Sequence, residues 1–241
     1  MLTNHPDPHL TRARILVVGM GGLGTPAAIA LAAAGVGTLG LVDSDVVELS
    51  NLPRQPLYEA ADLGRPKVEA AARRLTGGAP ALRVESHRRR FGADDTALAG
   101  AFDVVVDGTD TIAAKFAVND AAVAAGVPLV HAGALGLRAQ LMTVLPGRSP
   151  CYRCVFEEAP PPGDVASCDE AGVLGPTVAL AAALQAAEAI RIVRGQPPLF
   201  ADRLLVVDLA GGRHRRIPLS RNPRCPACGA VDHADQRSEA S

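Results

Sequence analysis

A glycine-rich turn between an apolar run and an alanine-rich stretch constrains the fold of this chain more than any other feature. The apolar run covers residues 14–18, and the turn at residues 19–24, Gly-Met-Gly-Gly-Leu-Gly, matches the pattern G-x-G-x-x-G. Glycines at these spacings let main-chain N–H groups approach a phosphate, and the N-terminus of the following helix attracts its negative charge. We predict a buried strand, a helix over about residues 25–34, and either a nucleotide (NAD or ATP) or a tight turn without a ligand.

An acidic residue follows the second predicted strand. Residues 38–42 are apolar and end on Asp43, which lies about 20 residues after Gly24. An acidic side chain at this spacing is typical of a nucleotide site, where it binds the ribose hydroxyls. A dehydrogenase fits these residues as well as an ATP-binding enzyme does.

Strand and helix patterns alternate through the first half of the chain. Beyond the first two strands, we predict helices at about 66–75 and 112–125 and strands at about 82–86, 103–106 and 128–131. Alternation of this kind is typical of a doubly wound, mostly parallel α/β sheet.

The pattern changes in the second half. Residues 138–145 alternate like an exposed strand, and 204–208 and 214–218 are joined by Gly211-Gly212, which predicts a hairpin. An apolar helix is expected after Pro176. We therefore expect the parallel sheet to continue into an antiparallel C-terminal part.

Composition indicates a folded globular chain. Of the 241 residues, 48% are hydrophobic and 20% charged, and the net charge of −1 argues against nucleic acid as the main partner. We expect a single domain over 1–229, with a nucleotide-binding half at about 12–135, a second half at about 136–229, and a polar tail at 230–241.

Neither a signal peptide nor a membrane span is expected. The first nine residues are polar, and Gln185, Glu188 and Arg191 interrupt the apolar helix after Pro176. A cytoplasmic chain is the simplest interpretation.

Three polar clusters separate this chain from a dehydrogenase. Parallel sheets place ligands beyond the carboxyl ends of their strands, so the clusters are expected to converge on the glycine turn. An arginine and a lysine offset phosphate charge, and a carboxylate binds Mg²⁺, which together suit triphosphate chemistry. The clusters are Asn51-Leu-Pro-Arg54-Gln55, Gly64-Arg-Pro-Lys67 and Asp107-Gly-Thr-Asp110.

Four of the five cysteines form two Cys-x-x-Cys pairs. Cys151 with Cys154 and Cys225 with Cys228 are separated by 70 residues. Four thiolates form a tetrahedral zinc site, and a full shell of protein ligands makes the zinc structural. Free buried thiols and disulfides are the alternatives, and a cytoplasmic location disfavours the disulfides.

These motifs together resemble the ubiquitin-activating enzyme superfamily, in its branch of ThiF-, MoeB- and HesA-like adenylyltransferases. The resemblance runs from about residue 14 to residue 228. It implies a Rossmann-like sheet, ATP and Mg²⁺ as cofactors, and structural Zn²⁺. The matching stretches are 19–24, Asp43, 51–55, 64–67, 107–110, 168–176 and the two cysteine pairs.

The resemblance also implies roles for individual residues. Arg54 stabilises charge during attack, Lys67 contacts the phosphates, and Asp110 coordinates Mg²⁺. Cys168 is a candidate for thioester or persulfide chemistry, with an incidental loop thiol as the alternative. The full set implied to bind ATP is Gly19, Gly21, Gly22, Gly24, Asp43, Asn51, Arg54, Gln55, Lys67 and Asp110.

The implied reaction is adenylation of a ubiquitin-like sulfur-carrier protein, similar to ThiS or MoaD. The C-terminal glycine carboxylate of the carrier attacks the α-phosphate and yields acyl-AMP and pyrophosphate. A carboxylate is already ionised at pH 7, so no general base is required. A homodimer and a separate sulfur donor are expected.

The chain departs from the family pattern at several positions. An Arg-Tyr-x-Arg-Gln motif of many relatives is absent before the first strand, and Arg12 or Arg14 would have to substitute for it. Thr111 stands where relatives usually have Asn, and Lys115 where they often have Arg. The missing N-terminal motif leaves open a weakly active carrier-binding scaffold. An NAD-dependent oxidoreductase with structural zinc is the other alternative, and Arg54 and Lys67 argue against it.

Two further residues are interpreted as structural. Tyr58 is expected to serve packing rather than the site. His131, at the end of a predicted strand, is expected to be a satisfied core histidine.

Overall fold

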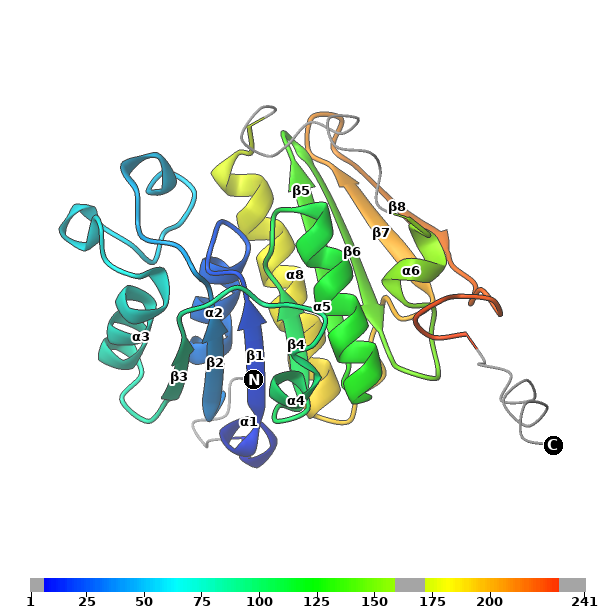
Figure 1. Ribbon diagram of the computed structural model, residues 1–241. Coiled ribbons are helices and arrows are strands. Elements are labelled where there is room, and N and C mark those ends of the chain that lie inside the picture. The colour runs from blue at the N-terminus through cyan, green and yellow to red at the C-terminus, as the bar shows by residue number, and fades with distance from the viewer. Residues whose placement is uncertain (1–6, 159–171, 230–241) are drawn as a thin grey trace.

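The fold is an eight-stranded mixed sheet with helices on both faces (Figure 1). The computed structural model describes residues 7–158 and 172–229. The strand order is β3-β2-β1-β4-β5-β6-β7-β8. In chain order the elements are α1 Pro8–Arg12, β1 Arg14–Val18, α2 Gly24–Ala33, β2 Thr38–Val42, η1 Leu49–Asn51, η2 Ala60–Asp62, α3 Lys67–Gly78, β3 Arg83–His87, α4 Thr96–Ala99, β4 Val104–Asp107, α5 Ile112–Ala125, β5 Leu129–Leu135, β6 Arg138–Val144, α6 Tyr152–Val155, α8 Gly175–Val193, β7 Arg203–Asp208 and β8 Arg213–Pro218.

The strands from β3 to β5 are parallel, and the order reverses at β1. There β1 pairs with β2 on one side and with β4 on the other, so that Ile15 lies beside both Leu39 and Val104. The strands β1, β2 and β4 are apolar and almost entirely buried, as expected for strands covered on both faces. Ligands of open α/β sheets bind at such a reversal, beyond the carboxyl ends of the strands.

The strand β5 joins the parallel and antiparallel parts. It pairs in parallel with β4 and antiparallel with β6, and it reaches Leu135 rather than ending near residue 131 as predicted. The antiparallel series continues to β8, which is the exposed edge. The mixed sheet and the β7–β8 hairpin are confirmed.

The expectation of an exposed β6 is wrong. Leu141, Met142, Thr143 and Val144 are all buried. The strand lies between β5 and β7, and alternate residues enter the hydrophobic clusters on the two faces of the sheet. Its polar residues fall mainly in its first half, which produced the alternating pattern.

The helices divide between the two faces of the sheet. The cluster on one face contains residues of α2, α3 and α8, and the cluster on the other contains residues of α4, α5 and α6. Figure 1 shows α5 in front of the sheet and α8 behind it. This arrangement confirms the doubly wound fold class.

The helix α8 is long and apolar enough, by length and composition alone, to cross a membrane. In this structure it packs against β5, β6 and α2 as a core helix. Glu188 is 1% exposed, and its carboxylate accepts hydrogen bonds from the Thr143 hydroxyl at 2.8 Å and from the Leu199 backbone N–H at 2.9 Å. Glu188 therefore faces inward and bonds to the sheet and to the loop after the helix.

Candidate functional site

The glycine turn lies at the carboxyl end of β1, where the strand order reverses. The Gly19 N–H donates to the Val42 carbonyl at 2.8 Å, and the Gly108 N–H donates to the Val18 carbonyl at 2.7 Å. The turn therefore has the end of β2 on one side and the loop after β4 on the other. The sequence correctly predicted that these segments converge.

The glycines of the turn serve two different purposes. Gly19 has φ +87°, and a Cβ there would lie 2.7 Å from the Gly108 carbonyl oxygen; a Cβ on Gly24 would overlap the Gly19 carbonyl. In contrast, a Cβ on Gly21 would lie 3.7 Å from the Gln55 amide nitrogen, and one on Gly22 would lie 3.4 Å from Val178, both ordinary contacts. The close packing of the protein requires Gly19 and Gly24, whereas a side chain at Gly21 or Gly22 would meet only ordinary contacts, so packing alone does not explain these two glycines.

Asp43 holds the glycine turn from the end of β2. Its carboxylate accepts hydrogen bonds from the Met20 N–H at 2.7 Å and from the Asp45 N–H at 2.8 Å. A carboxylate has about four lone-pair positions, so acceptor capacity remains for ribose hydroxyls. The structure thus adds a local role that the sequence pattern did not predict.

Tyr58 and Lys67 connect the turn to the start of α3. The Tyr58 hydroxyl lies 3.0 Å from the Met20 carbonyl and 3.3 Å from the Lys67 carbonyl, and burial holds the pKa of Tyr58 well above its usual range, so the group donates. The Lys67 ammonium is 3.1 Å from the Asp45 carboxylate. Tyr58 is buried, as expected, but it also bridges two parts of the site.

The segment after η1 carries the remaining predicted phosphate contacts. The Asn51 side chain accepts from the Glu48 N–H at 3.3 Å and thereby caps η1, and an Arg54 Nη donates to the Ser50 carbonyl at 2.9 Å. Gln55 is 3% exposed, and its Oε1 has no hydrogen-bond partner within the described part of the chain. An unpartnered buried oxygen under the glycine turn is a position where a ligand donor or a water fits.

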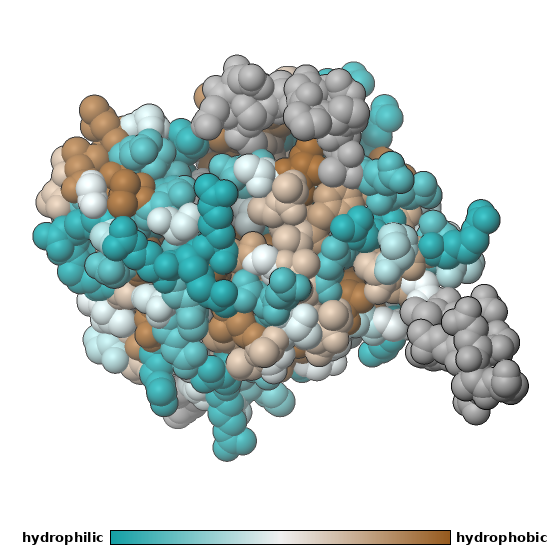
Figure 2. Space-filling view, in the orientation of Figure 1, coloured by the Kyte–Doolittle hydropathy of each residue, from teal (hydrophilic) through white to brown (hydrophobic). Residues whose placement is uncertain are grey.

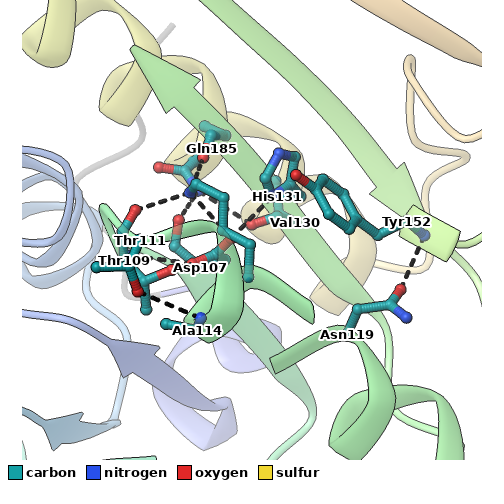
Figure 3. Close-up of polar contacts among 11 residues, drawn as sticks. Asp107, Thr109, Thr111, Ala114, Asn119, Val130, His131, Tyr152 and Gln185 are labelled. Atoms are coloured by element: carbon teal, nitrogen blue, oxygen red, sulfur yellow. Dashed lines mark hydrogen bonds and ion pairs between the residues drawn. The ribbon is translucent and has the colours of Figure 1, made fainter. Parts of the chain in front are cut away.

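A buried charged cluster lies beside the turn, at the end of β4 (Figure 3). Asp107 and His131 are buried, and His131 Nδ1 lies 2.7 Å from an Asp107 oxygen that Lys115 Nζ approaches at 3.3 Å. Although burial raises it, the charge of Lys115 and the hydrogen bond from His131 hold the pKa of Asp107 below its usual value. Burial lowers the pKa of His131, so the ring is neutral and its Nδ1–H donates.

The loop after β4 exposes a single carboxylate. Asp107 accepts from the Thr109 N–H at 2.9 Å and from the Thr109 hydroxyl at 2.6 Å, while Asp110 is exposed and bonds to no polar group of residues 7–158 or 172–229. Thr111 then caps α5 by accepting from the Ala114 N–H at 3.3 Å. A threonine at this position therefore performs a capping role for which Asn is equally suited.

The side chains and backbone groups described above fit the Mg²⁺ and ATP that the family resemblance implies. Mg²⁺ is usually held by one or two carboxylates together with substrate phosphates and water, and Asp110 offers an uncommitted carboxylate next to the glycine turn. The glycine turn at the start of α2 and the cationic Lys67 suit the phosphates.

The four paired cysteines form one cluster. Their Sγ atoms all lie within 4.8 Å of one another, with Cys151–Cys225 at 3.5 Å and Cys154–Cys228 at 3.4 Å. Four thiolates around zinc at about 2.3 Å place the sulfurs about 3.8 Å apart, so the cluster fits zinc with only small shifts. Such a site would be closed to substrate, because the protein supplies all four ligands.

The cysteine cluster is attached to the nucleotide-binding half through α6. The Tyr152 N–H donates to the Asn119 side chain on α5 at 2.8 Å, and Arg153 forms a bidentate ion pair with Asp120. The Tyr152 ring packs on His131 with ring centroids 4.6 Å apart, as Figure 3 shows. Tyr152, which follows Cys151 in the chain, thus links the cysteine cluster to the Asp107 cluster.

Three functional candidates were not recognised as site residues from sequence. Lys115 was noted only as a departure from the family, His131 as core, and Gln185 as a polar interruption of an apolar helix. In the structure Gln185 donates to the Asp107 carbonyl at 2.8 Å and to the Val130 carbonyl at 3.0 Å. The available sequence signal for Gln185 was its position as a polar residue in the middle of an apolar helix.

The structure does not bring Arg12 or Arg14 to the glycine turn. Arg14 lies at the amino end of β1, where it pairs with Glu85 at 3.1 Å, and Arg12 lies just before it. Both are at the edge of the sheet opposite to the glycine turn, so neither completes the site of its own subunit. Cys168 lies outside the described residues.

Comparison with known proteins agrees with this geometry. The chain is 42% identical to the sulfur carrier protein adenylyltransferase of Thermus thermophilus over 95% of this chain and 86% of that protein. It is 45% identical to the adenylyltransferase and sulfurtransferase MOCS3 of Sus scrofa over 91% of this chain and 49% of that protein, so it spans about half of that longer relative. The crystal structure of Escherichia coli MccB with ATP superposes with a TM-score of 0.79 at 25% identity, covering 92% of this chain and 67% of that one.

The family assignment extends over the sheet, the glycine turn and three of the four clustered cysteines. The sequence profile of the ThiF family matches residues 7–227, which include every element described above. The resemblance expected from the motifs is therefore confirmed, and this chain belongs to the ThiF family.

Proposed function

We propose that the chain is an ATP-dependent adenylyltransferase that activates the C-terminal glycine carboxylate of a ubiquitin-like sulfur-carrier protein. The observation that carries this proposal is the site at the strand reversal. The glycine turn, a buried lysine at the start of α3 and an exposed carboxylate after β4 lie together at the carboxyl edge of the sheet. This edge lies at the top of the sheet in Figure 1.

Each predicted residue has a role that its position supports. Backbone N–H groups near Gly21 and Gly22 bind phosphate, and Asp43 binds the ribose with the oxygen capacity left by its two backbone bonds. Arg54 and Gln55 border the turn from the segment after η1, and Asn51 caps η1 just before them. Lys67 can exchange Asp45 for a phosphate oxygen, because Asp45 is largely exposed and returns to water while the buried ammonium keeps an anionic partner.

The reaction needs alignment and charge stabilisation rather than proton transfer. The carrier carboxylate is ionised at pH 7, and it attacks the α-phosphorus as pyrophosphate leaves. Arg54 and Lys67 stabilise the negative charge that moves onto the leaving oxygens. Mg²⁺, when bound, neutralises charge on the phosphates, and Asp110 is the side chain that would hold it.

A zinc ion in the cysteine cluster has a structural role in this proposal. Cys225 and Cys228 follow β8 near the end of the described chain, and they meet Cys151 and Cys154 at α6. The metal ties the C-terminal segment to the middle of the chain and takes no part in adenylation.

The partner is a small carrier protein with a flexible C-terminal tail. The name of the Thermus thermophilus relative supports a sulfur carrier as substrate, and the MccB structure with ATP supports the nucleotide. Exposed leucines border the β5–β6 turn, and Figure 2 shows apolar residues gathered in the middle of the same face, as is typical of protein-binding surfaces. We further propose a homodimer, a separate sulfur donor, a cytoplasmic location, and Cys168 as the candidate for a covalent step.

The proposal is tested by ATP–pyrophosphate exchange with zinc-loaded protein and Mg²⁺. Exchange is expected only with a carrier that ends in Gly-Gly, and a carrier without its last glycine is the matched control. Exchange that Asp110→Ala abolishes would eliminate a non-catalytic scaffold. Absence of exchange across a panel of carriers, together with tighter calorimetric binding of NAD than of ATP, would overturn the proposal in favour of an oxidoreductase.

A further inference from the structure

Lys115 is a buried cation on α5. The residue is 8% exposed, and burial of an ammonium is unfavourable unless charge and hydrogen bonds compensate it. Asp107 supplies the opposite charge at 3.3 Å. His131 on the same carboxylate is neutral, so the buried cluster carries no net charge.

The three N–H groups of Lys115 reach three segments. Two donate to backbone carbonyls at 2.7 Å, those of Thr109 in the loop after β4 and of Ala132 in β5. The third approaches Asp107 at 3.3 Å. An ammonium donates in three diverging directions, so one side chain joins the loop, β4 and β5.

The two shorter bonds orient the peptide that leads into Asp110. The Thr109 carbonyl belongs to the peptide bond between Thr109 and Asp110, and the Thr109 N–H and hydroxyl are both held by Asp107. The Gly108 N–H is held by Val18, and the Asp107 carbonyl by Gln185. The backbone is therefore fixed up to the residue at which the loop presents a free carboxylate.

We propose that Lys115 is a positioning residue that sets the Asp110 carboxylate for metal-bound ATP through the Thr109 carbonyl. This inference rests on the proposed function, since it gives Asp110 a metal to hold. Lys115 itself touches neither metal nor nucleotide. Residues that orient a metal ligand typically change metal affinity by about 10–100-fold when they are removed.

The test measures Mn²⁺ binding directly, so it needs no carrier. Mn²⁺ serves as the probe in the presence of the non-hydrolysable ATP analogue AMPCPP, and free Mn²⁺ is quantified by electron paramagnetic resonance on the full-length, zinc-loaded protein. We expect Lys115→Met to weaken Mn²⁺ binding in the ternary complex by about 10-fold, with AMPCPP affinity in the absence of metal unchanged. Asp110→Asn is expected to weaken it at least as much.

A matched control separates positioning from loss of stability. Glu188→Gln also removes a buried charge, but its bonds are to Thr143, Leu199 and Phe200, away from the loop after β4. It is expected to lower the melting temperature and leave Mn²⁺ affinity unchanged. If Lys115→Met does not fold, the double variant Lys115→Met with Asp107→Asn leaves no unpaired charge, and its Mn²⁺ affinity is compared with that of Asp107→Asn alone, so that the difference reports the loss of Lys115.

Two results have different consequences. Wild-type protein that adds nothing to the Mn²⁺ affinity of AMPCPP alone would count against the proposed function itself. Wild-type protein that binds Mn²⁺ tightly, with a Lys115→Met variant within twofold of it, would overturn the positioning role and leave the proposed function intact.

Discussion

The two halves of this molecule hold their geometry by different means. At the nucleotide edge, a buried lysine, aspartate and histidine, backed by Gln185, bond to one another and to the backbone. In the C-terminal half, the four cysteines come within 4.8 Å of one another, and burial raises the pKa of Cys151, which opposes a thiolate there unless a cation is bound. The first region is internally neutralised, while the second is held by zinc in the proposed function.

Because the two regions are held together by different interactions, we expect them to respond to different perturbations. Removing zinc is expected to loosen the C-terminal strands first, and removing a charge at the nucleotide edge is expected to alter ligand binding before stability. The connection between them is the contact of Tyr152 with His131 and Asn119. The following predictions test this separation, in order of decreasing expected effect.

Loss of zinc should have the largest effect. Structural zinc sites contribute on the order of 10 kcal/mol of binding free energy in small domains. We expect Cys225→Ser to lose zinc by elemental analysis and to lose hydrogen-exchange protection in β7 and β8, with β1 and β2 still protected. Equal loss of protection in all four strands would contradict the separation.

Loss of the Asp110 carboxylate should abolish chemistry without loosening the fold. We expect Asp110→Ala to lower pyrophosphate exchange by about 100-fold or more, because an electrostatic group at the reacting phosphates is removed. Asp110 is exposed and makes no polar contact within the described residues, so thermal stability should stay within about 0.5 kcal/mol of the wild type. A large drop in melting temperature would show that Asp110 has a structural role instead.

Substitutions at two glycines of the same turn should separate the effect on packing from the effect on ATP binding. Gly24→Ala is expected to destabilise the fold by about 1–3 kcal/mol in chemical denaturation, because its Cβ would overlap the Gly19 carbonyl. Gly21→Ala meets only an ordinary contact and should keep stability while it weakens ATP binding in calorimetry. The distinction is wrong if both variants lose stability equally.

The smallest effect concerns pH. Burial lowers the pKa of His131 in the folded state, whereas in the unfolded chain it is about 6.5. The unfolded state therefore binds the proton first, and the stability present above pH 6.5 is lost as the pH falls below that value, with a slope of at most about 1.4 kcal/mol per pH unit. We expect His131→Asn, compared with wild type at equal zinc content, to flatten the melting temperature between pH 6.5 and 5. An unchanged slope would contradict the prediction.

Local patterns predicted most of the fold. The strands β1 and β2 and the helix α5 were expected with their observed bounds, because buried apolar runs, the glycine turn and Gly126 at φ +70° after α5 are short-range signals. The burial of β6 was not predicted, because it depends on which strands flank it. The extent of a single domain over 1–229 stays a prediction.

The sequence predicted residues for the candidate site, which stay a prediction, and it did not predict how their contacts are arranged. The motifs identified Lys67, Asp43 and Asp110, whereas the bonds around Asp107 join residues far apart in sequence, up to Gln185 on α8. No local pattern reports such a contact. The sequence also treated all four glycines as ligand contacts, although the structure gives Gly19 and Gly24 a packing role.

The distance between the cysteine pairs has a consequence for synthesis. At about 5–20 residues per second, a ribosome needs several seconds to extend the chain by the 70 residues between Cys154 and Cys225. During that time the first pair emerges with only two of the four sulfurs present. A zinc ion at the proposed site can therefore gain its last two ligands only after the second pair has emerged, late in the synthesis of the chain.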